Sequence, residues 1–215
     1  AKRIALAKWN NAGQICVAPD YILVHASVRD SFLQELKKVI LNFFTENPAT
    51  CGHYGRIINS KQFDRLVSYL KDGSIYHGGH YDRDQLYIEP TLLTDVAIDS
   101  PIMQQEIFGP LLPVLSYTSF EEAKSIIARN PNPLAFYVYT ENRTHEKAWL
   151  QQVPAGGACV NNSIFHLLNH RLPFGGRGTS GVGAYHGKYS FDTFSHQKSV
   201  LRTPTWPDPA LKYPP

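Results

Sequence analysis

Amphipathic helical segments alternate with short β-rich segments along this chain, and this alternation constrains the fold more than any other feature. Residues 28–44 carry apolar side chains at three- and four-residue steps, which predicts a helix. Asn59 and Ser119 are each followed three residues later by Gln or Glu, a helix-capping spacing that predicts two further helices. Strands are predicted at residues 17–25, 85–93, 111–116, 135–140, 156–161 and 192–200. The pattern predicts an α/β fold whose largely parallel sheet is flanked by helices.

Composition excludes several classes of protein. The 215 residues suit one large domain, and the 43% hydrophobic content supports a folded core. The net charge of +3 is spread without a basic cluster, so nucleic-acid binding is not indicated. No apolar run approaches the roughly 20 residues of a membrane span. The three cysteines are too few and too irregular for a disulfide framework or a metal site, which favours a reduced, intracellular setting.

The most reactive local feature is the segment at residues 11–17, which reads NAGQICV. A cysteine that follows a glycine-containing turn and precedes a strand is well placed to react. Gly13 allows close backbone approach, and the amide of Cys16 can point at a developing oxyanion. A thiolate is a strong nucleophile. The alternative is that Cys16 is a small buried apolar residue, as single cysteines often are.

The cysteine segment, continuing into VAPDY, closely resembles the active-site segment of aldehyde dehydrogenases, and especially of the class 3 branch that includes fatty aldehyde dehydrogenase. Further family-like segments follow in the same order: RIIN at 56–59, YIEPT at 87–91, MQQEIFGP at 103–110, LPFGG at 172–176 and YHGK at 185–188. Trp9, Ile15 and Glu89 depart from the usual family residues without removing the thiol. The resemblance covers almost the whole chain.

The resemblance implies a role for five residues. Cys16 matches the catalytic nucleophile, and Glu106 and Phe108 match the glutamate that holds the nicotinamide ribose and the aromatic residue beside the nicotinamide. Phe174 and Asn161 match positions near the substrate. From residue type alone, Glu106 could instead be a solvated surface acid and Phe108 a core residue, while Phe174 could serve packing and Asn161 could close a turn.

The resemblance further implies oxidation of an aldehyde by NAD or NADP through a cysteine thioester. The expected substrate is a medium- or long-chain aliphatic aldehyde or an aromatic one, and a cytoplasmic homodimer is expected, with membrane association possible for a longer form. Residues 1–200 are expected to form the catalytic domain, and the proline-rich residues 201–215 an extended C-terminal arm.

The family's dinucleotide-binding domain and general-base segment lie before the cysteine, and the fifteen residues that precede Cys16 match neither. The chain is therefore interpreted as the catalytic portion of a longer enzyme. Two alternatives stay open. One is a truncated, non-catalytic paralogue that regulates a full-length subunit, and the other is a thiol esterase that works without a nicotinamide.

Overall fold

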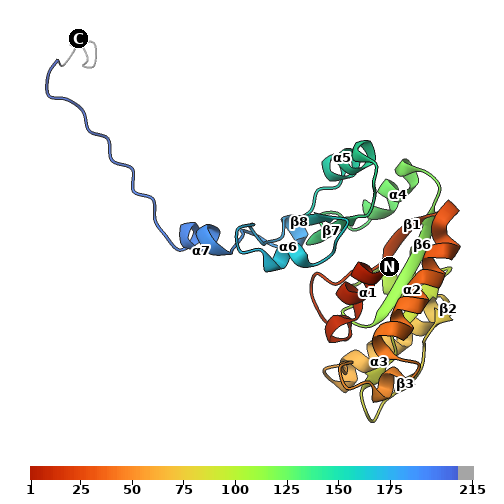
Figure 1. Ribbon diagram of the computed structural model, residues 1–215. Coiled ribbons are helices and arrows are strands. Elements are labelled where there is room, and N and C mark those ends of the chain that lie inside the picture. The colour runs from red at the N-terminus through yellow and green to blue at the C-terminus, as the bar shows by residue number, and fades with distance from the viewer. Residues whose placement is uncertain (208–215) are drawn as a thin grey trace.

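The computed structural model describes residues 1–207, and its centre is a four-stranded sheet (Figure 1). The strands are β1 (Ile22–His25), β2 (Ser74–His77), β5 (Thr91–Thr94) and β6 (Leu111–Tyr117). They lie in the order β1-β6-β5-β2. The pairs β1–β6 and β5–β6 are parallel, and β2 pairs with β5 in the antiparallel sense. The predicted α/β fold with a largely parallel sheet is confirmed.

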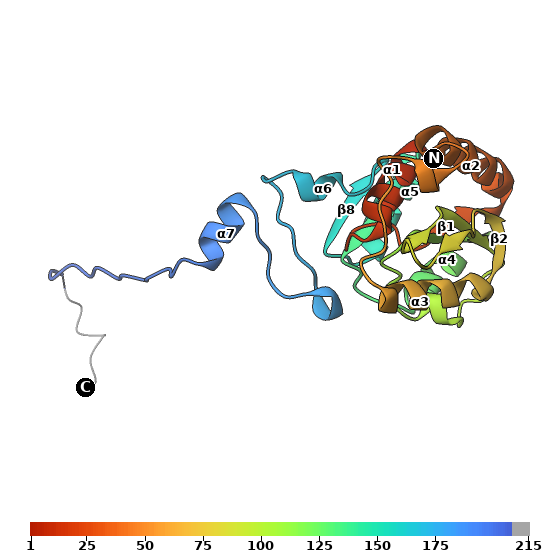
Figure 2. The same ribbon diagram turned by 90° about the horizontal axis from the view of Figure 1, so that it is seen from below.

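The predicted helices form close to their expected bounds. They are α2 (Arg29–Phe44), α3 (Ser60–Ser68) and α4 (Phe120–Ile127), and α1 (Lys2–Trp9) and α5 (Arg143–Gln152) are found as well. The side chain of Asn59 accepts from the backbone N–H of Gln62, and that of Ser119 accepts from the N–H of Glu122. Each cap satisfies a donor that the first helical turn leaves without a partner. Figure 2 shows α2 and α3 packed against the sheet from different sides.

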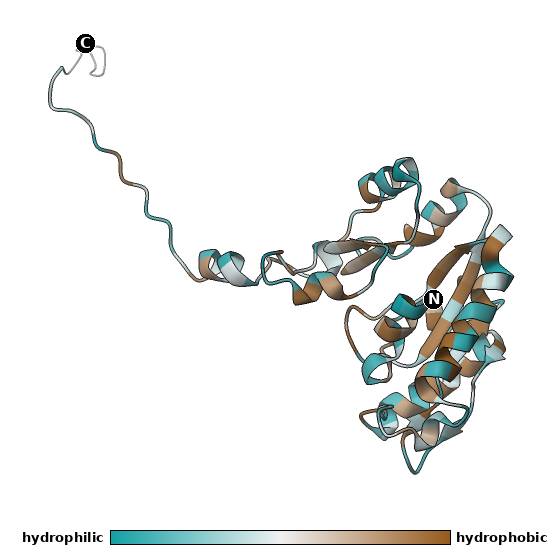
Figure 3. Ribbon diagram, viewed as in Figure 1, coloured by the Kyte–Doolittle hydropathy of each residue, from teal (hydrophilic) through white to brown (hydrophobic). Residues whose placement is uncertain are grey.

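The core lies between the sheet and its helices. The inward face of α2 consists of Leu33, Leu36, Val39, Ile40 and Phe44, each at most 6% exposed. These side chains pack with residues of α1, α3 and the strands in one hydrophobic cluster. Figure 3 shows the same arrangement as brown strands between helices with teal outer faces. Each fully buried large aliphatic or aromatic side chain contributes about 1.5–3 kcal/mol, so this cluster is the main source of stability.

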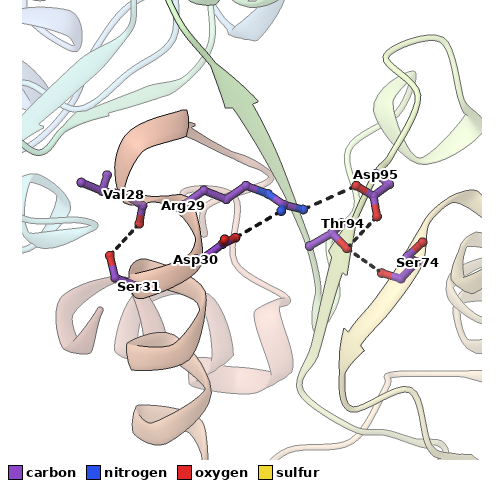
Figure 4. A network of polar contacts seen from close by, with 7 residues as sticks. All are labelled: Val28, Arg29, Asp30, Ser31, Ser74, Thr94 and Asp95. Carbon is purple, nitrogen blue, oxygen red and sulfur yellow. Dashed lines mark hydrogen bonds and ion pairs between the residues drawn. The ribbon is translucent and has the colours of Figure 1, made fainter.

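A polar network ties the start of α2 to the end of β5 (Figure 4). The guanidinium of Arg29 lies 3.3 Å from the carboxylate of Asp30 and 3.4 Å from that of Asp95. The Thr94 hydroxyl, beside Asp95, donates to the backbone carbonyl of Ser74 on β2 at 3.4 Å. These contacts are near the surface and supplement the core rather than replace it.

A smaller layer follows the central sheet. Strands β7 (Ala135–Val138) and β8 (Gly157–Val160) form a parallel pair, with α4 and α5 close by (Figure 1). The chain then continues through α6 (Phe165–Leu168) and α7 (Gly187–Thr193) and leads away from the rest of the molecule (Figures 1 and 2). Residues 201–207 of the predicted arm contain no helix or strand, and residues 208–215 lie outside the described residues.

Three strand predictions were wrong in part or entirely. The strand predicted at 17–25 begins only at Ile22, because residues 15–18 form a turn closed by the N–H of Ala18 on the carbonyl of Ile15. The strand at 85–93 is divided into β4 (Tyr87–Ile88), which pairs with β3 (Tyr81–Asp82), and β5, since Pro90 lacks an N–H for the ladder. The run at 192–200 is no strand, because its start completes α7 and its remainder meets no partner strand among residues 1–207.

In the part of the chain that the structure describes, no helix combines the length and the apolar character needed to cross a membrane. Within the same residues, the His, Cys, Asp and Glu side chains form no group of three or more that could hold a metal ion.

Candidate active site

The turn that carries Cys16 has an uncommon backbone. Asn11, Ala12 and Gly13 have φ angles of 50°, 53° and 76°, which are three successive left-handed residues. This conformation costs about 1–2 kcal/mol for each residue that bears a Cβ. Gly13 is required for a second reason, since a Cβ there would lie 2.2 Å from the carbonyl oxygen of Gly109. The turn is therefore strained and in direct contact with the segment that contains Glu106 and Phe108.

Cys16 differs from the other two cysteines in its surroundings. Its side chain is exposed, whereas Cys51 and Cys159 are half-buried. Burial raises the pKa of the Cys159 thiol, whose Sγ lies 3.3 Å from Nδ1 of His166. A thiol with a raised pKa supplies little thiolate at neutral pH. The interpretation of Cys16 as a small buried residue is therefore wrong, and Cys16 is the most exposed of the three thiols.

Side chains on both sides of the cysteine turn, and one on α3, hold the segment of residues 106–110 in place. The indole N–H of Trp9 donates to the carbonyl of Pro110 at 2.8 Å. The carboxylate of Asp20 accepts from the N–H of Ile107 at 2.9 Å. From α3, the guanidinium of Arg65 donates to the carbonyls of residues 106 and 107 at 3.2 and 2.7 Å. These bonds hold together two segments that lie about 90 residues apart in the sequence.

The side chains of Glu106 and Phe108 are both accessible. Phe108 is 38% exposed and has a φ of 47°, a conformation that is rare for a large residue and that its bonded neighbours maintain. Glu106 is also exposed, and its pKa is raised first by partial burial and then by the charge of Asp20. The suggestion that Phe108 is a core residue is wrong, and the surroundings of Glu106 are those of a partly shielded acid.

A buried lysine interacts electrostatically with acidic residues of this region. Lys8 on α1 is 1% exposed, and burial lowers its pKa to about 8, opposed by the negative charges of Asp20 and Glu106. Burial likewise raises the pKa of Asp20, while Lys8 acts in the opposite direction. Lys8, Asp20 and Arg65 were not among the residues predicted from the sequence. An ionisable residue between the apolar Ala7 and Trp9 was the signal that could have identified Lys8.

The other two candidate residues lie in the smaller layer. Phe174 is buried at 8% exposure and packs against the rings of His166, Tyr185 and His186, which fits a packing role. The side-chain oxygen of Asn161 accepts from the N–H of Thr140 at 2.9 Å, and its amide donates to the Thr140 carbonyl at 2.8 Å. These bonds join the residue after β8 to the chain just after β7, two strands that are paired, and they do not close a local turn. The roles of both residues in substrate binding stay predictions.

Two links connect this layer with the cysteine region. The hydroxyl of Tyr137 on β7 donates to the backbone carbonyl of Val17, the residue after Cys16, at 2.7 Å. The guanidinium of Arg3 on α1 donates to the backbone carbonyl of Asn161. The end of β8 and the cysteine turn thus belong to one connected region.

Comparison with known proteins assigns the chain to a family. The family model described as the aldehyde dehydrogenase family matches residues 1–200. The chain belongs to the aldehyde dehydrogenase family. It is 47% identical over its whole length to the 4,4'-diaponeurosporen-aldehyde dehydrogenase of Staphylococcus aureus and covers 47% of that protein. It is 43% identical over 98% of its length to the dimeric NADP-preferring aldehyde dehydrogenase of Bos taurus, of which it covers 88%.

Solved aldehyde dehydrogenase structures agree with this assignment. The substrate-bound state of Staphylococcus aureus AldH superimposes with a TM-score of 0.94 over the whole chain, at 47% identity, and the chain covers 47% of it. An indole-3-acetaldehyde dehydrogenase in complex with NAD+ gives a TM-score of 0.80 at 30% identity, with 93% of the chain and 42% of that structure covered. The chain spans about half the length of most of the curated relatives it matches. The resemblance to class 3 enzymes is confirmed, because relatives include family 3 members of Arabidopsis thaliana and Mus musculus at 45% and 46% identity.

Proposed function

We propose that this chain supplies the thiol-bearing portion of an NAD(P)-dependent aldehyde dehydrogenase, with Cys16 as the nucleophile. The observation that carries the proposal is that the accessible thiol lies on a strained turn, in contact with the segment of Glu106 and Phe108. Strain of this kind persists where the surrounding structure holds it, and it is common at reactive sites.

The chemistry assigned to Cys16 begins with its thiolate. The sulfur adds to the aldehyde carbon, a C–S bond forms, and the carbonyl electrons move to the oxygen. The N–H of Cys16 is the chain's own candidate for stabilising that oxyanion. A nicotinamide nucleotide held by Glu106 and Phe108 would supply the hydride acceptor by which the adduct on Cys16 becomes a thioester. Water then cleaves the thioester, which releases the carboxylic acid and restores the thiol.

Glu106 and Phe108 fit contacts to a nicotinamide nucleotide. Two carboxylate oxygens can accept hydrogen bonds from two ribose hydroxyls, and Glu106 is exposed, so its oxygens are available. The accessible ring of Phe108 can pack against a flat heterocycle. The bonds that hold this segment use the backbone carbonyl of Glu106 and the backbone N–H and carbonyl of Ile107, which lies between the two residues. Their functional atoms therefore stay available for a ligand.

For the substrate we propose a medium- or long-chain aliphatic aldehyde or an aromatic one. Support comes from the relative of Staphylococcus aureus, whose name specifies a diaponeurosporen aldehyde. We also propose a homodimer, which the name of the dimeric relative of Bos taurus supports. Large apolar side chains along α7 and beyond it, such as Phe191 at 71% exposure and Phe194 at 90%, are suited to subunit contact.

The decisive experiment is selective labelling of the cysteines. The protein is incubated with iodoacetamide at pH 7, and the labelled sites are mapped by mass spectrometry with and without a long-chain aldehyde and NAD+. We expect labelling to concentrate at Cys16 and to be suppressed by the aldehyde, and Cys51 and Cys159 serve as internal controls. Equal labelling of all three cysteines without protection would refute a formed nucleophile site. Protection by the aldehyde that NAD+ does not alter would favour the thiol-esterase alternative.

A further inference from the structure

The side chain of Gln14 uses both of its polar atoms to connect the cysteine turn with another part of the chain. Its amide nitrogen donates to the backbone carbonyl of Arg56 at 2.9 Å and to that of Asn11 at 3.1 Å. Its side-chain oxygen accepts from the N–H of Ile58 at 3.0 Å. A single carboxamide thus connects the residues before Cys16 with residues 56–58.

Within the turn, the same residue closes a reciprocal pair of bonds. The side-chain amide of Asn11 donates to the backbone carbonyl of Gln14 at 3.1 Å, and the N–H of Gln14 donates to the carbonyl of Asn11 at 3.2 Å. These bonds enclose the left-handed Ala12 and Gly13. Left-handed residues persist only where other interactions hold the backbone in place. Here Gln14 takes part in each of the three hydrogen bonds that join residues 11 and 14.

The segment of residues 56–58, to which Gln14 bonds, is itself held in place by other contacts. The guanidinium of Arg56 donates to the carbonyl of Ala49 at 2.7 Å and lies 5.0 Å from the centre of the Tyr87 ring. The hydroxyl of Tyr54 donates to the carbonyl of Ile88 at 2.9 Å, which ties this segment to β4. Gln14 therefore joins the turn to an anchored segment and not to a free loop.

We propose that Gln14 is a positioning residue, whose carboxamide holds the strained turn so that the thiol and the N–H of Cys16 keep the orientation that aldehyde addition needs. The inference rests on the proposed role of Cys16. Gln14 itself touches neither substrate nor cofactor in this scheme. It acts through the backbone of residues 11–16, and both halves of the amide contribute, since the nitrogen holds the turn and the oxygen holds Ile58.

Two variants separate these halves. Gln14→Glu keeps an acceptor for the Ile58 N–H but loses the donor to Arg56 and Asn11, and Gln14→Leu loses both. Gln151→Glu on α5 is the matched control, because Gln151 is exposed and far from the turn in sequence. Circular dichroism establishes that each variant is folded at the assay temperature, which lies well below its unfolding midpoint.

The first measurement is hydrogen–deuterium exchange of the full chain, followed in peptides that cover residues 9–21 and 56–60. We expect both variants to accelerate exchange in residues 9–21 by about tenfold, the effect of losing one or two net hydrogen bonds. Exchange at Ile58 should accelerate in Gln14→Leu and stay near wild type in Gln14→Glu. Unchanged exchange in residues 9–21 of both variants would overturn the proposal.

The second measurement is aldehyde protection of Cys16 against iodoacetamide. We expect the aldehyde concentration for half-protection to rise about tenfold in Gln14→Glu, while Gln151→Glu matches wild type. A variant that exchanges faster yet binds aldehyde as wild type does would show a structural role only and would overturn positioning. If the wild-type protein shows no protection, the proposed function fails, and the exchange data alone decide whether Gln14 holds the turn.

Discussion

Replacing Gly13 by Ala tests whether the close approach of the cysteine turn to the Glu106 segment is required for the fold. A Cβ at this position would lie 2.2 Å from the carbonyl oxygen and 2.6 Å from the carbonyl carbon of Gly109. Both are backbone atoms that cannot rotate away, so one of the two segments must move. The φ of 76° adds a conformational penalty that does not depend on the contact.

The size of the effect follows from these two contributions. A left-handed conformation costs an Ala about 1–2 kcal/mol relative to its relaxed state. Inserting a methyl group into a closely packed contact costs about 1–3 kcal/mol. The Ala also restricts the unfolded chain, which returns about 0.4–1 kcal/mol. The free energy of unfolding should therefore fall by about 2–4 kcal/mol.

Two other glycines provide graded controls in urea unfolding followed by fluorescence. At Gly52, whose φ is not left-handed, an added Cβ meets nothing within 4 Å, so Ala should be neutral or slightly stabilising. Gly79 has a φ of 93°, and its Cβ would meet side-chain atoms of Ile75, the nearest of them the terminal Cδ1 at 2.9 Å, and no backbone atom among its nearest neighbours, so Ala should cost about 1 kcal/mol. If the Gly13 variant lost no more stability than the Gly79 variant, the argument that backbone contact fixes the turn would be refuted.

Further predictions concern buried and exposed polar groups. The pKa of Lys8 is lowered from 10.5 to about 8 in the folded chain, so between those values the unfolded state binds more protons at this residue, and the contribution of Lys8 to stability should rise from pH 8 to pH 10.5. A Lys8→Met variant should lose that rise in urea midpoints measured across the range. Tyr137→Phe leaves the Val17 carbonyl without its donor and should cost about 1–2 kcal/mol in urea unfolding. It should also weaken aldehyde protection at Cys16, unlike Tyr139→Phe just after β7, because the Tyr139 hydroxyl bonds Ser163 and not the cysteine segment. Arg83→Gln removes an exposed ion pair, and its thermal midpoint should match that of wild type.

The sequence predicted what depends on local periodicity and capping. The helices that begin after Asn59 and Ser119 form where they were expected, because a side-chain cap and an apolar stripe act over a few residues. Strand ends were less accurate, since Pro90 and the turn before Ile22 interrupt runs of β-forming residues. The segment at 192–200 has the composition of a strand, but a strand also needs a partner, and local sequence does not report one.

For the candidate site, too, local motifs could be predicted from the sequence and long-range contacts could not. Cys16 and Glu106 could be put forward as candidates because they lie in contiguous motifs, whereas Asp20 and Arg65 act on Ile107 from 87 and 42 positions away. Such contacts exist only after the chain has folded, and nothing in the local sequence marks them. The position of Lys8 between apolar residues indicates that it is buried, but nothing in the local sequence indicates that the charge of Asp20 acts on it.

The position of the strain suggests what the fold contributes to the chemistry. The left-handed residues Ala12 and Phe108 lie on the two segments that meet at the Gly13–Gly109 contact. Neither segment would hold this conformation by itself, because each such residue costs about 1–2 kcal/mol. The bonds from Trp9 to Pro110 and from Asp20 to Ile107 offset that cost only when both segments are present. Exposure alone does not make a cysteine a nucleophile, because the thiolate is the reactive form. What this fold adds is that it keeps the strained turn before Cys16 and an exposed carboxylate in one fixed arrangement.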